Sequence, residues 1–487
     1  MKQYLFLITV CILGTSAGRI HGQFADSLHL AELQDMARQQ ALGVALAERD
    51  FILAENDVDQ YRASLSPQLS LNANFPNYAR SAQETTQPDG SIAFQPVRIN
   101  NSFVGVDFQQ RIGPTGGLLF ASTNLQRFDN FESDFRQYRG LPIRVGLQQP
   151  ILAFNPWKWD KRILPVAAEA ARLRRTAETE AAALSATSLF FNLLTADQNR
   201  QLAEFNENVN QQLLEVARER FELGSISRND LVQIELELVS AQQARQSARL
   251  ELDQASAAIY RFLGLAYAGI PIQPVQPEAP ALPNMEATEL ANLARRLRPE
   301  WLEAQVNILS AERAIDQARR DNGPRLDLLA SFGLVRSDEN LSEVYADPQR
   351  EEIIQLQLSL PIIDGGTRRT AIREAEALAD YTKQEATFTQ NQLLGDLQIS
   401  LTELERTART LELAEDISRL AEERFSISQE SYLLGAMPLT DLNLAQRSRD
   451  QSRRAYISQL RDYCVAFNRL SLLTGFDFIN NIPHSEL

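Results

Sequence analysis

The sequence has few of the residues from which most catalytic and metal centres are built. Its three histidines, at positions 21, 29 and 484, all stand near the ends of the chain. This placement argues against a histidine-based metal site or general base. Of the two cysteines, Cys11 lies in a predicted leader and Cys464 stands alone, so the mature chain has no pair for a disulfide. We interpret Cys464 as a small buried helix residue rather than a reactive thiol, and we predict neither cofactor nor metal.

Positive charge and long apolar runs are also scarce. The chain has 48 Lys and Arg against 63 Asp and Glu, a formal charge of -15, which argues against nucleic acid as a partner because phosphate binding needs basic patches. Residues 1–22 have a basic start, an apolar stretch and then small residues, which is typical of a secretory signal peptide. No later stretch offers about 20 apolar residues, so we expect an exported chain without a transmembrane helix.

The rest of the chain is an internal repeat. A shift of 257 residues places Pro67 on Pro324 near the start of each half, and a shift of 211 applies further along. The second shift aligns Leu223-Gly224 with Leu434-Gly435, Asp230-Leu231 with Asp441-Leu442, and Gly264 with Gly475. Chance agreement of these prolines, glycines and Gly-to-Asp spacings is improbable over such a length, so we read each half as one copy of the same structural unit.

Each half has the same predicted plan of helix, strand hairpin, long helix, turn and helix. The stretches QLSLNANF and RLDLLASFGLV follow the aligned prolines and alternate apolar with polar residues, as strands do. From Leu231 to Phe262 apolar residues recur at spacings of three and four, which predicts coiled-coil packing. Gly224 and Gly435 fit helix C-caps. The short turns behind them predict antiparallel helical hairpins.

These patterns divide the chain into segments. We predict a signal peptide at 1–22. The first repeat then has its first helix at 23–66, strands at 67–152 and a helical hairpin at 153–264. After a linker at 265–285, the second repeat has its first helix at 286–323, strands at 324–363 and a helical hairpin at 364–475, followed by a tail at 476–487.

The strands are the predicted means of crossing a membrane. A chain without apolar helices can span lipid only as a closed β-barrel. Two hairpins are too few to close one, so several copies must share it. The first half also carries an extra hairpin at 101–128, which either joins the barrel or lies outside it. Phe154, Trp157 and Trp159 mark the change from strand to helix. They fit an aromatic belt at the membrane interface, or else a local cluster at a chain bend.

The sequence resembles the TolC-type outer membrane efflux proteins. The resemblance depends on the twofold repeat, the stretch RPEWLEAQVNILSAERAIDQARRDNGPRLDL at 298–328, the strand ends QPIL and LPII, and the two Gly-to-Asp turns. It implies a mainly α fold with a membrane β-barrel, in which a homotrimer combines an α-helical barrel in the periplasm with a shared β-barrel in the outer membrane. The implied function is a passive exit duct of a tripartite efflux or type I secretion system. A periplasmic adaptor would connect it to an inner-membrane pump.

The resemblance also assigns roles to the hairpin tips. It implies a periplasmic gate formed by Asp441, Asp230 and Tyr432. Adaptor docking is implied for the tip residues Phe221, Leu223, Gly224, Leu434 and Gly435. Two further positions of the family pattern are replaced here by Leu444 and Met437, so the polar latch is only partly kept. Asp230 and Asp441 fit helix N-caps equally well.

Two other functional classes compete with the channel. A periplasmic or surface coiled-coil scaffold would explain the heptad spacing, but not the proline-bounded strands at matching places in both halves. An enzyme is disfavoured by the lack of internal histidine and of a phosphate-binding glycine loop. The cargo and the class of pump cannot be inferred from the sequence.

Overall fold

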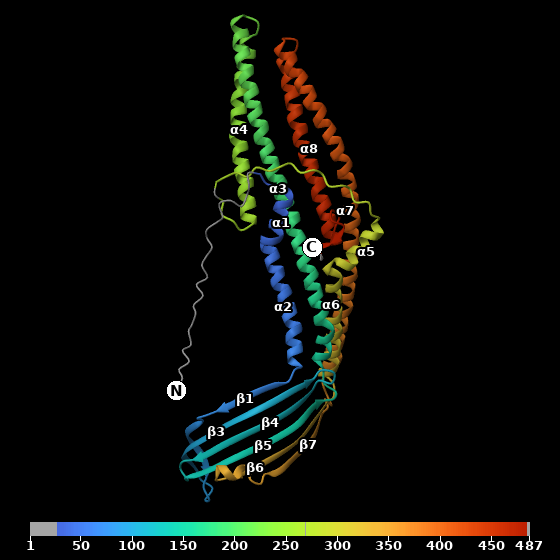
Figure 1. Ribbon diagram of the computed structural model, residues 1–487. Coiled ribbons are helices and arrows are strands. Elements are labelled where there is room, and N and C mark those ends of the chain that lie inside the picture. The colour runs from blue at the N-terminus through green and yellow to red at the C-terminus, as the bar shows by residue number, and fades with distance from the viewer. Residues whose placement is uncertain (1–26, 268, 485–487) are drawn as a thin grey trace, which may run out of the picture. The chain divides into compact units, whose positions relative to one another are not determined.

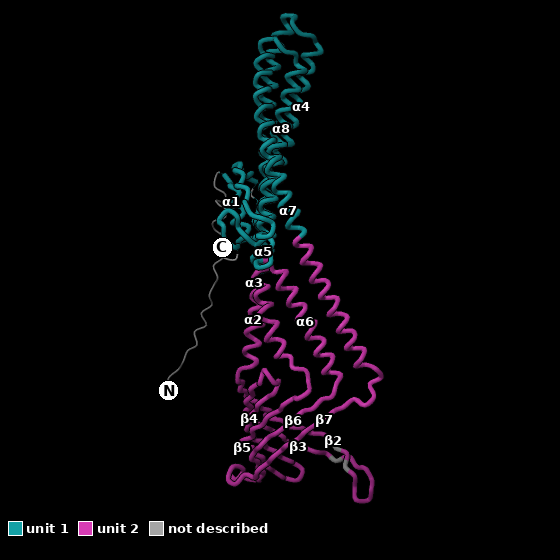
Figure 2. Tube along the Cα trace, turned by 90° about the vertical axis from the view of Figure 1, so that its right-hand side faces the viewer, with its two compact units in different colours: residues 1–47, 175–297, 395–487 teal, residues 48–174, 298–394 magenta. Residues whose placement is uncertain are grey.

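The computed structural model describes residues 27–267 and 269–484, so the predicted signal peptide lies outside the described part of the chain. Two compact units are present, and each is made of discontinuous segments (Figure 2). Among the described residues, unit 1 comprises 27–47, 175–267, 269–297 and 395–484, and unit 2 comprises 48–174 and 298–394.

Unit 2 contains one antiparallel sheet, whose strands are labelled in Figure 1 except for β2, which is labelled in Figure 2. Its order is β1-β3-β4-β5-β6-β7, and β2 pairs with the outer part of β3. The strands are β1 (Gln68–Asn74), β2 (Tyr78–Thr86), β3 (Ile92–Ile112), β4 (Gly117–Asn130), β5 (Phe135–Pro150), β6 (Arg325–Asp338) and β7 (Gln349–Ser359), with a short 3-10 helix, η1 (Leu341–Tyr345), between the last two. Among the described residues, β1 and β7 each pair on one side only, so this sheet is open at both edges.

The hairpin at 101–128, which the sequence leaves open, is part of this sheet. Its strands β3 and β4 lie between β1 and β5. The turn between β3 and β4 is held in place at the start of α3 (Pro156–Glu222), because the Asn155 amide donates to the Gly113 and Pro114 carbonyls at 2.9 and 3.2 Å. Arg111 stacks over the ring of Trp157, 4.7 Å from its centroid.

Polar contacts connect the helices of unit 2. The indole of Trp159 on α3 donates to Asp316 on α6 (Pro299–Asp321) at 2.9 Å, and Asp160 pairs with Arg313 at 2.8 Å. Arg319 reaches Glu376 on α7 (Thr367–Leu433) at 2.7 Å. The start of α3 is therefore fastened to the helix that precedes the second strand pair.

Unit 1 is built from helical hairpins of both repeats. It contains the second parts of α3 and α7, together with α1 (Leu30–Gln40), α4 (Arg228–Phe262), α5 (Ala287–Leu297) and α8 (Leu439–Thr474). Its main apolar core includes Phe190 and Phe191 of α3, Leu404 of α7 and Phe467 of α8. Cys464 lies in the same core, and burial raises the pKa of its thiol to about 12, as expected of a structural cysteine.

The first helix of each repeat is broken, which corrects the prediction of one continuous helix in each of the segments 23–66 and 286–323. The first is divided into α1 and α2 (Leu42–Ser64), with Ala41 extended between them at ψ 136°. The second is divided into α5 and α6 at Arg298, which is extended at ψ 138°. The two breaks lie 257 residues apart, the shift that aligns this part of the repeat. Pro299 explains the second break because the residue before proline avoids the helical conformation; Ala41 has no such signal.

The linker and the tail pack onto the helices of unit 1. Leu28 exchanges backbone hydrogen bonds with Gln273 and Val275, at 2.8 and 2.9 Å. In the tail, β8 (Phe476–Asp477) pairs with β9 (Ile482–Pro483). Over the described ranges, 27–267 and 269–484, no helix is both long enough and apolar enough to cross a membrane.

Candidate functional site: the helical hairpin tips

The two hairpin tips have the same backbone geometry. In the first, the amides of Gly224 and Ser225 donate to the carbonyls of Phe221 and Arg220 at 2.9 and 2.8 Å, and Gly224 has a φ of 70°. In the second, the amides of Gly435 and Ala436 donate to the equivalent carbonyls, both at 2.9 Å, and Gly435 has a φ of 77°. Both turns are Schellman motifs, in which glycine tolerates the left-handed conformation. The predicted C-caps are therefore correct.

The two tip aspartates are not N-caps, which corrects that interpretation. The N-caps of α4 and α8 are Ser227 and Pro438, and each aspartate lies three residues further on, in the first helical turn. Asp230 completes a capping box with Ser227, because its carboxylate accepts from the Ser227 amide and hydroxyl at 3.1 and 2.8 Å. Pro438 offers neither group. The Asp441 side chain is exposed, and its carboxylate has no recorded hydrogen bond or ion pair within the described residues.

Tyr432 lies in the core of the tips rather than on their surface. Its side chain is 5% exposed and belongs to an apolar cluster to which all four helices contribute, including Leu213 of α3, Ile234 of α4 and Leu442 of α8. Burial raises the pKa of the Tyr432 hydroxyl, the nearby charge of Asp230 raises it further, and Arg220 opposes the shift. The gate role that the resemblance implies for Tyr432 and Asp230 stays a prediction.

Arg220 is the tip residue that sequence reasoning missed. Its guanidinium donates to the carbonyls of Leu433 and Tyr432 at 2.9 and 3.4 Å, and lies 5.4 Å from the centroid of the Tyr432 ring. These carbonyls belong to the last turn of α7, whose acceptors have no partner within the helix. Arg220 therefore connects the end of α3 in the first repeat to the end of α7 in the second. Its signal in the sequence is a basic residue in the last turn of α3.

The outermost tip residues expose apolar side chains. Leu223 and Leu434 occupy equivalent positions directly before the two glycines, and are 81% and 84% exposed. Phe221 is also exposed. The two leucines thus form an apolar feature that is repeated at matching places in both tips.

A buried polar cluster connects the hairpins below the tips. Arg449 of α8 lies between the rings of Phe205 and Phe425, with centroids 4.5 and 4.2 Å from its guanidinium carbon. It donates to Asp450 at 3.0 Å and to Asn206 at 2.8 Å, and both Arg449 and Asp450 are buried. A buried charge that is paired and hydrogen-bonded in this way fixes the packing of α3 against α7 and α8.

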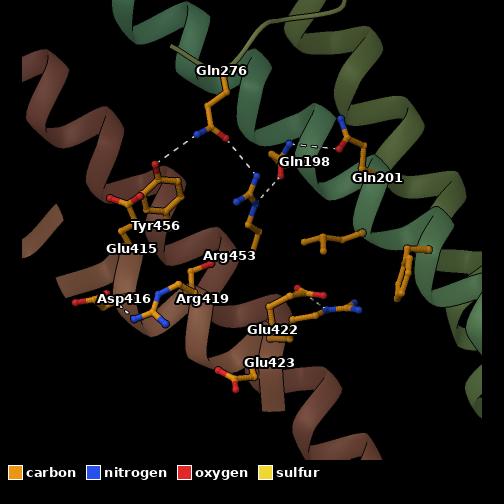
Figure 3. Close-up of a pocket in the computed structure, with 14 residues that line it drawn as sticks. Gln198, Gln201, Gln276, Glu415, Asp416, Arg419, Glu422, Glu423, Arg453 and Tyr456 are labelled. Carbon is orange, nitrogen blue, oxygen red and sulfur yellow. Dashed lines mark hydrogen bonds and ion pairs between the residues drawn. The ribbon is translucent and has the colours of Figure 1, made fainter. Parts of the chain in front are cut away.

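A groove of about 810 Å³ opens beside this cluster. In Figure 3, Gln276 of the linker lies above Arg453 and Tyr456 of α8, while Glu415, Asp416 and Glu422 line the α7 side. Arg453 donates to Gln198 and Gln276 at 3.1 and 3.2 Å, so one arginine joins α3 to the linker. No group of three or more His, Cys, Asp or Glu is arranged to hold a metal in the part of the chain that the structure describes.

The predicted interface aromatics differ in exposure. Trp159 is 7% exposed and bonds Asp316, which favours the local structural role for this residue. Phe154 and Trp157 are half-buried, with Arg313 and Arg111 over their rings at 5.9 and 4.7 Å. The interface assignment remains a prediction for Phe154 and Trp157.

Comparison with known proteins gives a consistent result. The profile described as outer membrane efflux protein matches residues 117–265 and 290–476. Protein CyaE of Bordetella pertussis is 26% identical over 258 residues, which are 52% of this chain and 53% of CyaE, about half its length. Alkaline protease secretion protein AprF of Pseudomonas aeruginosa is 21% identical over 349 residues, 71% of this chain and 72% of AprF. The CmeC outer membrane channel of Campylobacter jejuni shares the fold, with a TM-score of 0.66 at 15% identity over 94% of this chain and 87% of CmeC.

Proposed function

The chain belongs to the outer membrane efflux protein family, and on this basis we propose that it is the trimeric exit duct of an efflux or secretion system, gated at its hairpin tips. Family membership makes it an outer membrane transport protein and not an enzyme. The proposal adds that three copies share a membrane barrel and that their helical hairpins form a periplasmic conduit.

One observation carries the membrane part of this proposal. Strand pairing places Leu328 and Ala330 of β6 opposite Leu356 and Ile354 of β7, all on one face of the sheet. The other face carries the polar Asp327 of β6 and Gln355 and Gln357 of β7, together with Leu329 and Ile353. A wall with one continuous apolar side and polar groups on the other supports contact with lipid on the first side and with water on the second.

The tips support docking of a periplasmic adaptor. Leu223 and Leu434 are exposed at equivalent places in two turns of the same geometry. A partner with a matching pair of apolar sites would bury both leucines, at about 1.5–3 kcal/mol for each fully covered side chain. The inner-membrane pump would connect through this adaptor.

The gate is proposed to depend on Asp441. Its carboxylate is exposed, whereas that of Asp230 is occupied by the capping box of its own helix. In a trimer, threefold symmetry would repeat the Asp441 carboxylate three times around one axis. Like charges several ångströms apart repel by roughly 1 kcal/mol or more per pair at an effective dielectric near 20, and such a ring favours cations.

The names of two relatives support a proposal for the class of cargo. AprF is named as an alkaline protease secretion protein, which favours export of a polypeptide. CmeC is named as an outer membrane channel, a description that a general efflux duct also fits. We favour secretion because the AprF alignment covers 71% of this chain at sequence level.

Conductance in a planar lipid bilayer tests the channel and its gate together. We expect the intact protein to give a small conductance that prefers cations over anions. In Asp441→Asn this preference for cations should be smaller. Asp230→Asn is the matched control, because it removes the same charge from the equivalent position in the other repeat. Absence of any conductance would refute the channel, and equal effects of the two substitutions would remove Asp441 from the gate.

A further inference from the structure

We propose that each copy supplies six adjacent strands to the closed barrel, and that β1 of one copy pairs with β7 of the next. Three copies of six strands each would give eighteen. This inference rests on the proposed trimeric channel, and adds to it the number of strands and the residues that join the copies.

The extra hairpin has the surface of a membrane wall. Val104, Val106 and Phe108 of β3 are paired with Leu125, Thr123 and Ala121 of β4. Since alternate residues of a strand share a face, the registers place these side chains on the same face as those of the neighbouring strands, namely Leu69 and Leu71 of β1, Val145 and Leu147 of β5, and Leu328 and Ala330 of β6. The apolar face thus continues across all six strands.

The opposite face of the added hairpin is mixed, and carries polar side chains together with Phe103 of β3 and Phe120 of β4. Asp107 and Gln109 of β3 alternate with the apolar residues, and they pair with Ser70 and Gln68 of β1. The turn of the hairpin is also fixed at the base of the sheet by Asn155. A hairpin that lay outside the barrel wall would need neither this alternation nor this attachment.

Both edges of the sheet need partners. Edge strands carry unpaired amides and carbonyls, and in hydrocarbon each unsatisfied group costs several kcal/mol. All five pairings along the sheet are antiparallel, so β1 and β7 run in opposite directions. A second copy can therefore continue the same antiparallel pattern at either edge.

The stagger of the sheet fits a closed barrel. Paired residues lead from Gln68 through Gln109, Phe120, Gly146 and Ser331 to Ile353. Ile353 lies six residues before Ser359, where β7 ends. If Ser359 pairs with Gln68 of the next copy, the register advances by six residues over every six strands. With strands about 4.8 Å apart and about 3.3 Å per residue, this advance gives a tilt of about 35°. Membrane barrels have tilts of about 35–45°.

Pairing Gln68 of one copy with Ser359 of the next also matches the side chains along the junction. Leu69, Leu71 and Ala73 would face Leu358, Leu356 and Ile354. On the other side, Ser70 and Asn72 would face Gln357 and Gln355. A slip of one residue would put leucines against glutamines, so the polar and apolar faces fix the register. Barrels of sixteen to eighteen strands enclose an aqueous channel.

Disulfide cross-linking tests the junction. In a Cys464→Ala background, Ser70→Cys combined with Gln357→Cys should form, after mild oxidation, covalent species of two and three copies and none larger, because the ring closes. The matched control is Ser70→Cys with Asp327→Cys, since Asp327 is paired with Gln357 but lies one strand further in. Equal cross-linking in both variants, or none in the first, would overturn the proposed junction.

Thiol labelling in lipid nanodiscs tests the number of strands separately from the channel. With a membrane-impermeant maleimide, cysteine at Asp107 should react at least about tenfold faster than cysteine at Val106, because only the first faces water. Asp327→Cys and Leu328→Cys give the same comparison on β6. If the two labelling rates differ on β6 but not on β3, the six-strand wall is overturned, while the proposal of a membrane channel stands. Absence of contrast on β6 would refute the proposed membrane channel itself.

Discussion

At the scale of single residues, the chemistry of the tips depends on the groups that precede each aspartate. Ser227 gives Asp230 two donors, and Pro438 gives Asp441 none. The sequence contains this distinction, since Ser-x-x-Asp at a helix start is a capping-box pattern and Pro-x-x-Asp is not. The two aspartates align with each other in the repeat, but the residues three positions before them, Ser227 and Pro438, differ.

Arg220 should keep the tips together. Arg220→Ala removes two hydrogen bonds to the last turn of α7 and the contact with Tyr432. For a half-exposed group the loss is about 1 kcal/mol, which shifts an equilibrium between closed and open tips about fivefold. We expect a larger bilayer conductance. Arg218→Ala removes the same charge from an exposed position on the same helix, and a similar increase in that variant would contradict the role of Arg220.

Arg449 should matter for stability rather than for conductance. Arg449→Met leaves Asp450 buried without its cationic partner, which costs about 3 kcal/mol or more in the free energy of unfolding. Urea denaturation in detergent, followed by circular dichroism, measures this loss.

Two further variants control the Arg449 experiment. Adding Asp450→Asn to Arg449→Met should recover part of the stability, because the unpaired charge is removed. Arg447→Met, on an exposed position of the same helix, should cost less than about 1 kcal/mol. If Arg449→Met behaves like Arg447→Met, the buried cluster does not hold the hairpins together.

At the scale of elements, residue periodicity and the positions of proline and glycine predict the strands and turns, but they do not predict the breaks in the first helices. The strands beside Pro67 and Pro324 and the glycine turns at 224 and 435 are where the sequence indicates them, because alternation and left-handed glycine are local properties. The break at Pro299 also has a local signal. The break at Ala41 has none, and comparison of the repeats is the only route by which the sequence could have revealed it.

The glycines that end α7 and α8 should differ in how well they tolerate substitution by alanine. Gly435 has a φ of 77°, and a Cβ added there meets no atom within 4 Å, so Gly435→Ala carries only backbone strain of about 1 kcal/mol. Gly475 has a φ of 68°, but an added Cβ would lie 2.8 Å from the Cβ of Leu297. Gly475→Ala should therefore cost at least about 2 kcal/mol. Equal unfolding midpoints for the two variants would show that the contact with Leu297 relaxes freely.

At the scale of the whole molecule, the fold class and the family can be predicted from the sequence, and both predictions are confirmed. The position of the extra hairpin could not be predicted. Alternation shows that residues 101–128 form strands, but long-range pairing decides between a place inside the sheet and a place outside it. The pairing of Phe108 with both Leu69 and Ala121 provides this information.

The competing scaffold can be tested by mass. Light scattering after size-exclusion chromatography in mild detergent should give a protein mass three times that of one chain if three copies share the barrel, with detergent covering the apolar sheet face. Removal of the detergent should cause aggregation. The same material unfolded in urea gives the mass of one chain as a control. A rod that stays dispersed without detergent would favour the scaffold.

The unequal surroundings of Asp230 and Asp441 have a consequence for how a duplicated protein divides its work. One oxygen of the Asp230 carboxylate accepts both hydrogen bonds of its own helix start, so binding calcium, magnesium or a basic peptide there competes with the cap. The Asp441 carboxylate has no such competing contact. We therefore expect external cations to bind the second repeat more readily than the first, although the two backbones have the same turn.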